Sequence, residues 1–143
     1  MMKKFLTACT LALALSITAC KPAAQGGTLL DLKGRWVGTS ESIVRGNALH
    51  HAAPGGNEPL RDNVEFTFAI TGQDGRRFWG SVSSKAGKEP IIGLIALDGK
   101  TIVASDSDGI LEGTIIDPDT IDLVYHHTGQ SMVVAANRIK RQK

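Results

Sequence analysis

The four histidines, which come as two adjacent pairs, are the side chains best suited to chemistry in this chain. His50-His51 lies in a long polar stretch, and His126-His127 ends an alternating one. Neutral imidazole is a good ligand for zinc and copper. Adjacent residues of a strand point to opposite faces, however, so His126 and His127 cannot both reach one ion, and no third ligand is signalled. We therefore predict no metal site and no cofactor.

The segment Asp106-Ser107-Asp108-Gly109 has the first residues of a calcium-binding loop. The rest of that loop pattern is missing, because Asp117 stands where a bidentate glutamate belongs. A tight hairpin turn accounts for the segment better. Serine, histidine and aspartate all occur in the chain, but no nucleophile elbow or comparable motif accompanies them. We predict no catalytic residues, and expect a binding protein rather than an enzyme.

The stretch Met1–Cys20 resembles the export signal of bacterial lipoproteins. Lys3 and Lys4 precede an apolar run, from Phe5 to Ile17, that is too short for a membrane-spanning helix. The run leads to Ile17-Thr18-Ala19-Cys20, which resembles a lipobox. In that family the cysteine is lipidated and becomes the first residue of the mature chain. An ordinary signal peptide, cut nearby and leaving a free thiol, is the alternative.

This resemblance implies a signal peptide at 1–19, a lipidated tether at 20–28 and a single domain at 29–143. Lys21, with no aspartate after the cysteine, resembles the sorting pattern for the outer membrane, so we expect an anchored envelope protein that faces the periplasm. Cys9 leaves with the leader and Cys20 takes the lipid, so no disulfide is expected. The mature chain balances 14 basic residues against 14 acidic ones, which argues against nucleic acid as a partner.

Short alternating segments fill the chain after the tether. Val64, Phe66, Phe68 and Ile70 share one face of the clearest segment. Three Asp-Gly turns and other short connections force neighbours in sequence to pair antiparallel. A meander of about eight strands closes because closure removes its exposed edges, whereas a two-sheet sandwich needs longer connections. We predict an all-β, antiparallel up-and-down barrel with strands near 35–44, 64–71, 76–84, 90–97, 100–105, 110–116, 120–127 and 131–139.

Gly34-x-Trp36 at the start of the first strand, with Arg138 on the last, resembles the calycin superfamily of lipocalins, fatty-acid-binding proteins and avidins. The resemblance implies that Trp36 closes one end of the barrel and that Arg138 lies across its ring. A guanidinium over an indole contributes about 0.5–2 kcal/mol. The chain departs from the family in having no disulfide and no helix after the barrel. Its strands carry no avidin-like set for biotin.

The interior of a barrel of this size is either filled or holds one small ligand. The inward side chains are bulky, which favours a filled or nearly filled barrel. The connection from Arg45 to Asp62 is longer than usual loops and carries His50 and His51. We predict a contact or lid surface there, an insertion without a role being the alternative.

Trp79 alternates with Phe78, so one of the two faces outward, and a tryptophan beside Arg77 is typical of a partner contact. Packing of Trp79 under a loop is the alternative. Two functions stay open: the barrel binds a small apolar ligand, such as an acyl chain, or it grips a periplasmic protein as an inhibitor or scaffold. The residues predicted to contact a ligand or partner are His50, His51, Arg77, Trp79, Tyr125 and His127.

Overall fold

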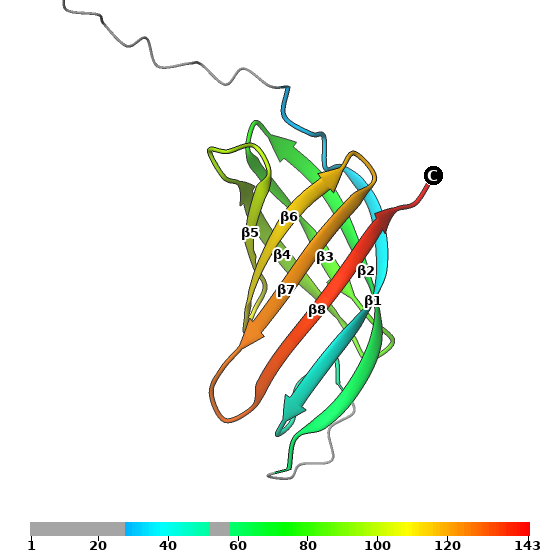
Figure 1. The fold of residues 1–143 in the computed structure, drawn as a ribbon, viewed down its shortest axis with the longest axis vertical. Helices are drawn as coiled ribbons and strands as arrows, with labels where there is room; N and C mark the ends of the chain where they lie inside the picture. The colour runs from blue at the N-terminus through cyan, green and yellow to red at the C-terminus, as the bar shows by residue number, and fades with distance from the viewer. Residues whose placement is uncertain (1–27, 52–57) are drawn as a thin grey trace, which may run out of the picture.

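The computed structural model, which describes residues 28–51 and 58–143, is a closed barrel of eight antiparallel strands in chain order (Figure 1). The all-β up-and-down architecture is thus confirmed. The leader, Cys20 and residues 52–57 of the long connection after Arg45 lie outside the described residues. No helix in the described part is long and apolar enough to cross a membrane. The strands are β1 (Gly34–Arg45), β2 (Leu60–Asp74), β3 (Arg77–Ser83), β4 (Lys88–Ile95), β5 (Thr101–Ser105), β6 (Ile110–Asp117), β7 (Thr120–His127) and β8 (Met132–Arg141).

Period-two alternation creates the inner and outer faces of the barrel. In β2, Phe68 and Ile70 are buried while Glu65 and Thr71 are exposed. The first and last strands pair as expected: Trp36 lies opposite Arg141, and Val44 opposite Val133. Closure gives every strand two hydrogen-bonded neighbours. The strands and buried core residues of the described part all lie between residues 28 and 143, so a chain that starts at residue 20 retains every one of them.

Apolar side chains from every strand fill most of the interior. The largest is Trp36, at 1% exposure. Chains packed this closely leave few voids, and the expectation of a nearly filled barrel agrees with the packing. The buried members are Leu32, Trp36, Val44, Phe68, Ile70, Phe78, Val82, Ile91, Ile95, Ile102, Ala104, Leu111, Ile121, Leu123, Val133, Ala135 and Ile139.

The two ends of the barrel differ. One end, which we call the closed end, carries the turns between β2 and β3, between β4 and β5, and between β6 and β7. The segment 28–33 and the C-terminus lie at the same end (Figure 1). The other end, which we call the open end, carries the described parts of the connection between β1 and β2, residues 46–51 and 58–59, and the turns at 84–87, 106–109 and 128–131. The predicted loop was too long, because β2 starts at Leu60 and pairs with Val44 rather than starting after Asp62.

The segment at 28–33 plugs the closed end. Gln73 fixes it, since Leu32 N donates to Gln73 Oε1 at 2.7 Å and Gln73 Nε2 donates to Leu30 O at 2.9 Å. Trp36 Nε1 donates to Leu32 O at 2.9 Å. Residues 29–32 form no helical turn, and their backbone groups bond instead to the side chains of Gln73 and Trp36. The leucines still pack on the core, with Leu32 only 2% exposed.

A guanidinium covers Trp36, but it belongs to Arg141. Its central carbon lies 4.1 Å from the ring centroid. The same group donates to Lys33 O at 2.8 Å and to Asp31 O at 2.7 Å, which ties the plug to the last strand.

The prediction that Arg138 closes the barrel was wrong. Arg138 points outward and donates to both oxygens of Asp122, at 2.6 and 2.7 Å. The reason is alternation: Ala135 and Ile139 are buried, so the inward face of β8 continues to Arg141 and not to Arg138. The general geometry that the resemblance implied is present with a different arginine.

Candidate ligand-binding site

A cavity of ≈ 50 Å³ opens beneath the β1–β2 connection at the open end. About 10–15 Å³ on this measure is enough for a water molecule, so the cavity holds a few waters or one compact organic group. A second space of ≈ 30 Å³ lies deeper, against Trp36, and its lining is almost entirely apolar. The floor of the cavity at the open end consists of Phe66, Phe68, Val82, Leu111, Leu123, Val133 and Ala135.

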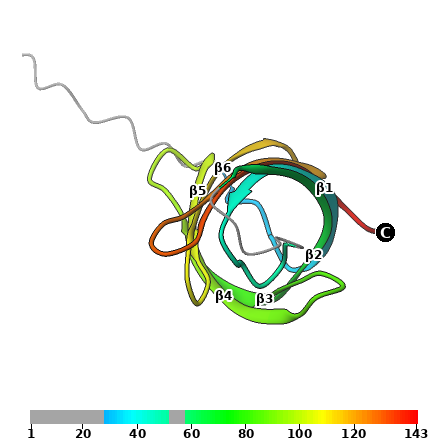
Figure 2. The ribbon, with the colours of Figure 1, turned by 90° about the horizontal axis from the view of Figure 1, so that it is seen from below.

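The described part of the β1–β2 connection, Gly46–His51, folds over this mouth (Figure 2). Gly46 has a φ of +81°, a left-handed conformation that glycine adopts without strain. The segment then forms a small turn, in which His51 N donates to Ala48 O at 3.1 Å. Leu49 reaches across to the β3–β4 turn at Gly87. The segment forms one wall of the cavity.

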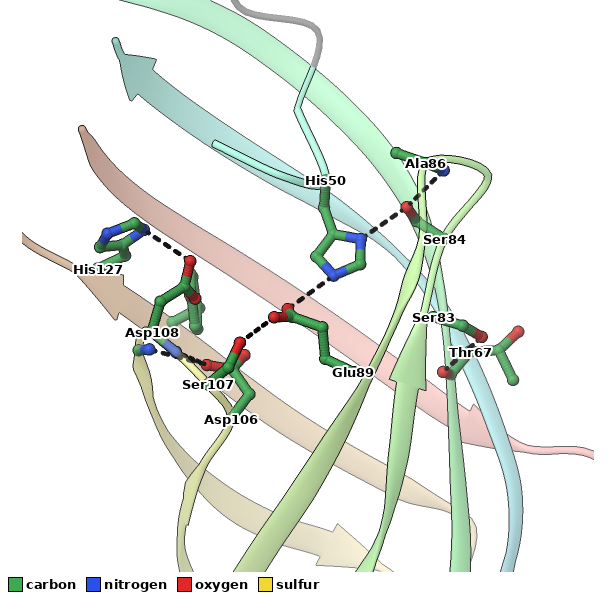
Figure 3. A network of polar contacts seen from close by, with 12 residues as sticks. His50, Thr67, Ser83, Ser84, Ala86, Glu89, Asp106, Ser107, Asp108 and His127 are labelled. Atoms are coloured by element: carbon green, nitrogen blue, oxygen red, sulfur yellow. Dashed lines mark hydrogen bonds and ion pairs between the residues drawn. The ribbon is translucent and has the colours of Figure 1, made fainter. Parts of the chain in front are cut away.

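His50 attaches this segment to the opposite wall (Figure 3). Its Nε2 lies 2.9 Å from Glu89 Oε2, and its Nδ1 lies 2.8 Å from Ser84 Oγ. A carboxylate only accepts, so Nε2 donates to Glu89, and in the neutral ring Nδ1 accepts from Ser84. The His50 and Glu89 side chains are only 10% and 9% exposed. Phe66 meets the imidazole edge-on, with centroids 5.3 Å apart.

His51 attaches the same segment to β2. Its Nδ1 lies 3.1 Å from Asp62 Oδ2 and 3.5 Å from Ser42 Oγ, and its side chain is 4% exposed. Ser42 Oγ also donates to Asp62 O at 2.8 Å. The two adjacent histidines therefore bond to different strands and hold the segment from both sides.

The turn between β5 and β6, residues 106–109, faces His50 across the mouth of the cavity. The prediction that these residues form a hairpin turn is confirmed. Asp106 Oδ1 accepts from Gly109 N at 2.8 Å and from Asp108 N at 3.2 Å. The Ser107 hydroxyl donates to Glu89 Oε1. Ligand oxygens of Glu89, Asp106 and Asp108 lie within 4.8 Å of one another, although acidic groups gather in this way without an ion too. Burial raises the pKa of Asp106, and the charges of Glu89 and Asp108 add to that rise.

Tyr125 and His127 complete the rim from β7. The Tyr125 hydroxyl donates to Asp108 Oδ1 at 2.8 Å. The pKa of Tyr125 is raised well above its ordinary value, mainly by burial and secondly by the hydrogen bond to Asp108. The hydroxyl therefore stays protonated and acts as a donor. His127 Nδ1 lies 3.6 Å from Asp108 Oδ2, while His126 is exposed on the outer face. The predicted opposite orientation of this pair is confirmed.

Asn137 lines the inner wall and has an unpaired acceptor. Its Oδ1 is buried and has no hydrogen-bond partner among the described residues. A buried acceptor left without a donor costs about 1–3 kcal/mol. Gly38 makes room for this amide, because a Cβ there would lie 2.5 Å from Asn137 Oδ1. A water or a ligand with a hydrogen-bond donor would satisfy the oxygen.

Four of the six predicted contact residues line this one cavity: His50, His51, Tyr125 and His127. The other two lie elsewhere. Trp79 faces outward at 47% exposure, its ring packed over Gly72, and Phe78 is the buried one of the pair. Arg77 is exposed beside it and pairs with Asp74 at 3.1 Å.

Sequence reasoning missed several members of the site. Glu89 was excluded because the fourth strand was expected to start at Pro90, two residues after its actual start at Lys88. Its parity with the buried Ile91 and Ile95 was the available signal, since it places a carboxylate on the inward face. Asn137 shares the inward parity of Ala135 and Ile139 in the same way.

No protein-family model and no curated protein matches the chain. In structure the chain is similar to the S-type phycobiliprotein lyase CPES from Guillardia theta. The TM-score is 0.36 at 12% sequence identity, covering 78% of this chain and 89% of that one. At that TM-score, the similarity carries no argument about a ligand or a reaction.

One expectation is corrected here. The sequence was expected to give a binding protein rather than an enzyme, whereas this structural neighbour is a lyase, which is an enzyme. The expectation that the chain lacks catalytic activity is not kept, and the neighbour assigns no reaction to this chain. The rim itself contains groups that hold and donate protons, namely His50, Glu89 and Tyr125.

Proposed function

We propose that this chain is a lipid-anchored protein of the cell envelope whose barrel binds a compact ligand at its open end. The ligand has a small apolar body and a head that donates hydrogen bonds. The observation that carries the proposal is the cavity itself, which joins an apolar floor to a rim of acceptor oxygens. Sites of this kind bury an apolar body and orient it with a few polar groups.

The size of the cavity narrows the ligand class. Drug-sized ligands occupy pockets of about 300–1,000 Å³, and this cavity of ≈ 50 Å³ is far smaller. A long acyl chain, the example given for a small apolar ligand, would have to displace the packed core around Phe68 and Trp36. A single ring or a short branched group is the better match.

The charge of the rim selects the head group. Asp106 and Asp108 line the cavity, Glu89 adjoins them, and none of the described lining residues is a lysine or arginine. A carboxylate head would meet like charges in a partly desolvated place, whereas an amine or hydroxyl would find acceptors. The orphan oxygen of Asn137 is a further acceptor for such a donor.

The anchor is the second part of the proposal. Cys20 follows a lipobox-like Ile17-Thr18-Ala19 and carries the lipid, and Lys21 directs the mature chain to the outer membrane. Several acyl chains are needed for firm attachment, because one chain binds only marginally. Substitution Cys20→Ser is expected to abolish the incorporation of labelled palmitate into the protein. A protein that incorporates no palmitate with Cys20 present, or still incorporates it after that change, would contradict the anchor.

The binding test uses benzylamine as the probe, with benzoate for comparison, in an NMR titration of the chain that starts at residue 20 and carries Cys20→Ser. We expect saturable shifts with benzylamine and none with benzoate. Ala135→Leu should abolish them by filling the cavity, and Ala136→Leu, on the exposed face of the same strand, should leave them unchanged. Equal loss in both variants, or equal binding of both probes, would contradict the site. Thermal unfolding of each variant checks that it folds.

A further inference from the structure

A second surface, on the outside of the barrel, carries exposed apolar side chains that the cavity does not explain. Trp79 on β3 lies opposite Ile92 on β4, and Leu94 on β4 lies opposite Val103 on β5. Their exposed fractions are 47, 66, 46 and 41%. Cross-strand partners lie side by side, so the four residues form one continuous patch, which we call the Trp79 face.

The patch continues to the closed end of the barrel. Leu97, in the turn between β4 and β5, is 85% exposed, the highest value among the large apolar side chains given for the described residues. Arg76 in the neighbouring β2–β3 turn, Arg77 at the start of β3 and Lys100 lie on the turns around Leu97 together with Asp74 and Asp98, so these five charged residues carry a net charge of +1. A protruding leucine with a tryptophan and basic residues is the composition that inserts into the headgroup region of a bilayer.

The chain enters the barrel at this same end. Figure 1 shows the blue segment after residue 28 beside the turns of the closed end. Cys20 precedes Thr28 by eight residues, which span at most about 28 Å when fully extended. If Cys20 is anchored in the lipid, the closed end therefore stays within that distance of the bilayer.

We propose that the Trp79 face and Leu97 form a membrane-contact surface, and that the barrel rests on an anionic lipid surface with its closed end down. The reach of the tether rests on the proposed lipid anchor, whereas the surface is a property of the barrel alone. The occupant is lipid rather than a second copy, because the tether holds this end of the barrel near the bilayer and the local net charge of +1 attracts anionic headgroups. The cavity then faces away from the membrane, and its ligand enters from the aqueous side.

The test is binding of the unlipidated chain, starting at residue 20 with Cys20→Ser, to vesicles of phosphatidylethanolamine and phosphatidylglycerol. Sedimentation should show partition into the vesicles that weakens with salt. Emission should shift to the blue because Trp79 leaves water while Trp36 is already buried. Leu97→Asp should lower the partition coefficient about tenfold or more, because the variant no longer has the leucine side chain that the wild type inserts into the bilayer.

The matched control is Ile43→Asp. Ile43 is 50% exposed and lies opposite the exposed Val134, toward the open end and away from the Trp79 face. This variant should keep wild-type partition. Three results would overturn the proposal: no association with vesicles, equal loss in both variants, or a dimer in sedimentation equilibrium that Leu97→Asp dissociates. These three results depend neither on benzylamine binding nor on lipidation in cells. Failure of the membrane-contact proposal is therefore distinguishable from failure of the proposed function.

Discussion

Replacement of Arg141 by methionine is expected to weaken the closed end far more than the same change at Arg138. Methionine keeps an unbranched apolar stem while it removes the charge and the donors. Arg141 lies 4.1 Å from the Trp36 centroid, its side chain is 20% exposed, and it donates to Lys33 O and Asp31 O. Arg138 pairs with Asp122 on the surface, at 63% exposure.

The contacts set the magnitudes. A cation–π contact contributes about 0.5–2 kcal/mol, and a hydrogen bond from a charged donor about 1.5–3 kcal/mol when buried and less when solvated. For Arg141→Met we expect a loss of about 2–3 kcal/mol in the free energy of unfolding. A surface ion pair contributes about 0–1 kcal/mol, so Arg138→Met should cost at most that.

Urea unfolding of the chain from residue 20 with Cys20→Ser, followed by tryptophan fluorescence, measures the difference. With an m-value of about 1.5 kcal/mol/M, Arg141→Met should lower the midpoint by about 1.3–2 M, and Arg138→Met by less than about 0.7 M. Arg141→Lys should fall between wild type and methionine, because lysine keeps the charge but loses the planar fork. If Arg138→Met proves as destabilising as Arg141→Met, our account of barrel closure is refuted.

Three further predictions concern a glycine, a carboxylate and a histidine. Gly80→Ala should destabilise by at least about 2 kcal/mol in urea unfolding, because its Cβ would lie 2.0 Å from the Ala69 carbonyl oxygen; Gly87→Ala, with its nearest atom 3.6 Å away, is the near-neutral control. Asp106→Asn should stabilise the fold at pH 7. Burial raises the pKa of Asp106 in the folded state above its ordinary value of 3.8, so the ionised carboxylate lowers the stability of the wild type at pH 7. The stability gained by Asp106→Asn should vanish as the pH falls below 3.8, where the wild-type carboxyl is protonated. A gain that persists below that pH would contradict the assignment. His50→Ala should speed hydrogen exchange at His51 N at least about tenfold by freeing the Gly46–His51 segment, whereas His126→Ala on the outer face should leave that rate unchanged.

The barrel could be predicted because its signals are local. Asp74-Gly75 and Asp98-Gly99 are turns with positive φ at glycine, and the alternation between them gives each strand its inward face. Short connections then leave few topologies. The bounds of β2 were harder to predict, because residues 60–63 join the strand through pairing with β1 rather than through an apolar pattern of their own.

The site was predicted only in part, for a physical reason. His50, His51, Tyr125 and His127 drew attention by residue type, but their meeting with Asp108 and Glu89 depends on how the closed sheet brings separate turns to one end. The alternation of buried and exposed side chains would by itself have assigned Arg141 rather than Arg138 to the ring of Trp36, and it would have placed Glu89 on the inner face of the barrel. The hydrogen bonds of His50 across the mouth have no signal in the sequence.

The central claim is that a compact ligand enters the open end and rests on the apolar floor. The most direct measurement is the set of intermolecular NOEs between benzylamine ring protons and methyl groups in a chain labelled at alanine, valine and leucine. We expect NOEs to Val82, Leu111, Leu123 and Ala135, which line the cavity. NOEs to Leu94 and Leu97 instead, or none at saturating benzylamine, would contradict the account.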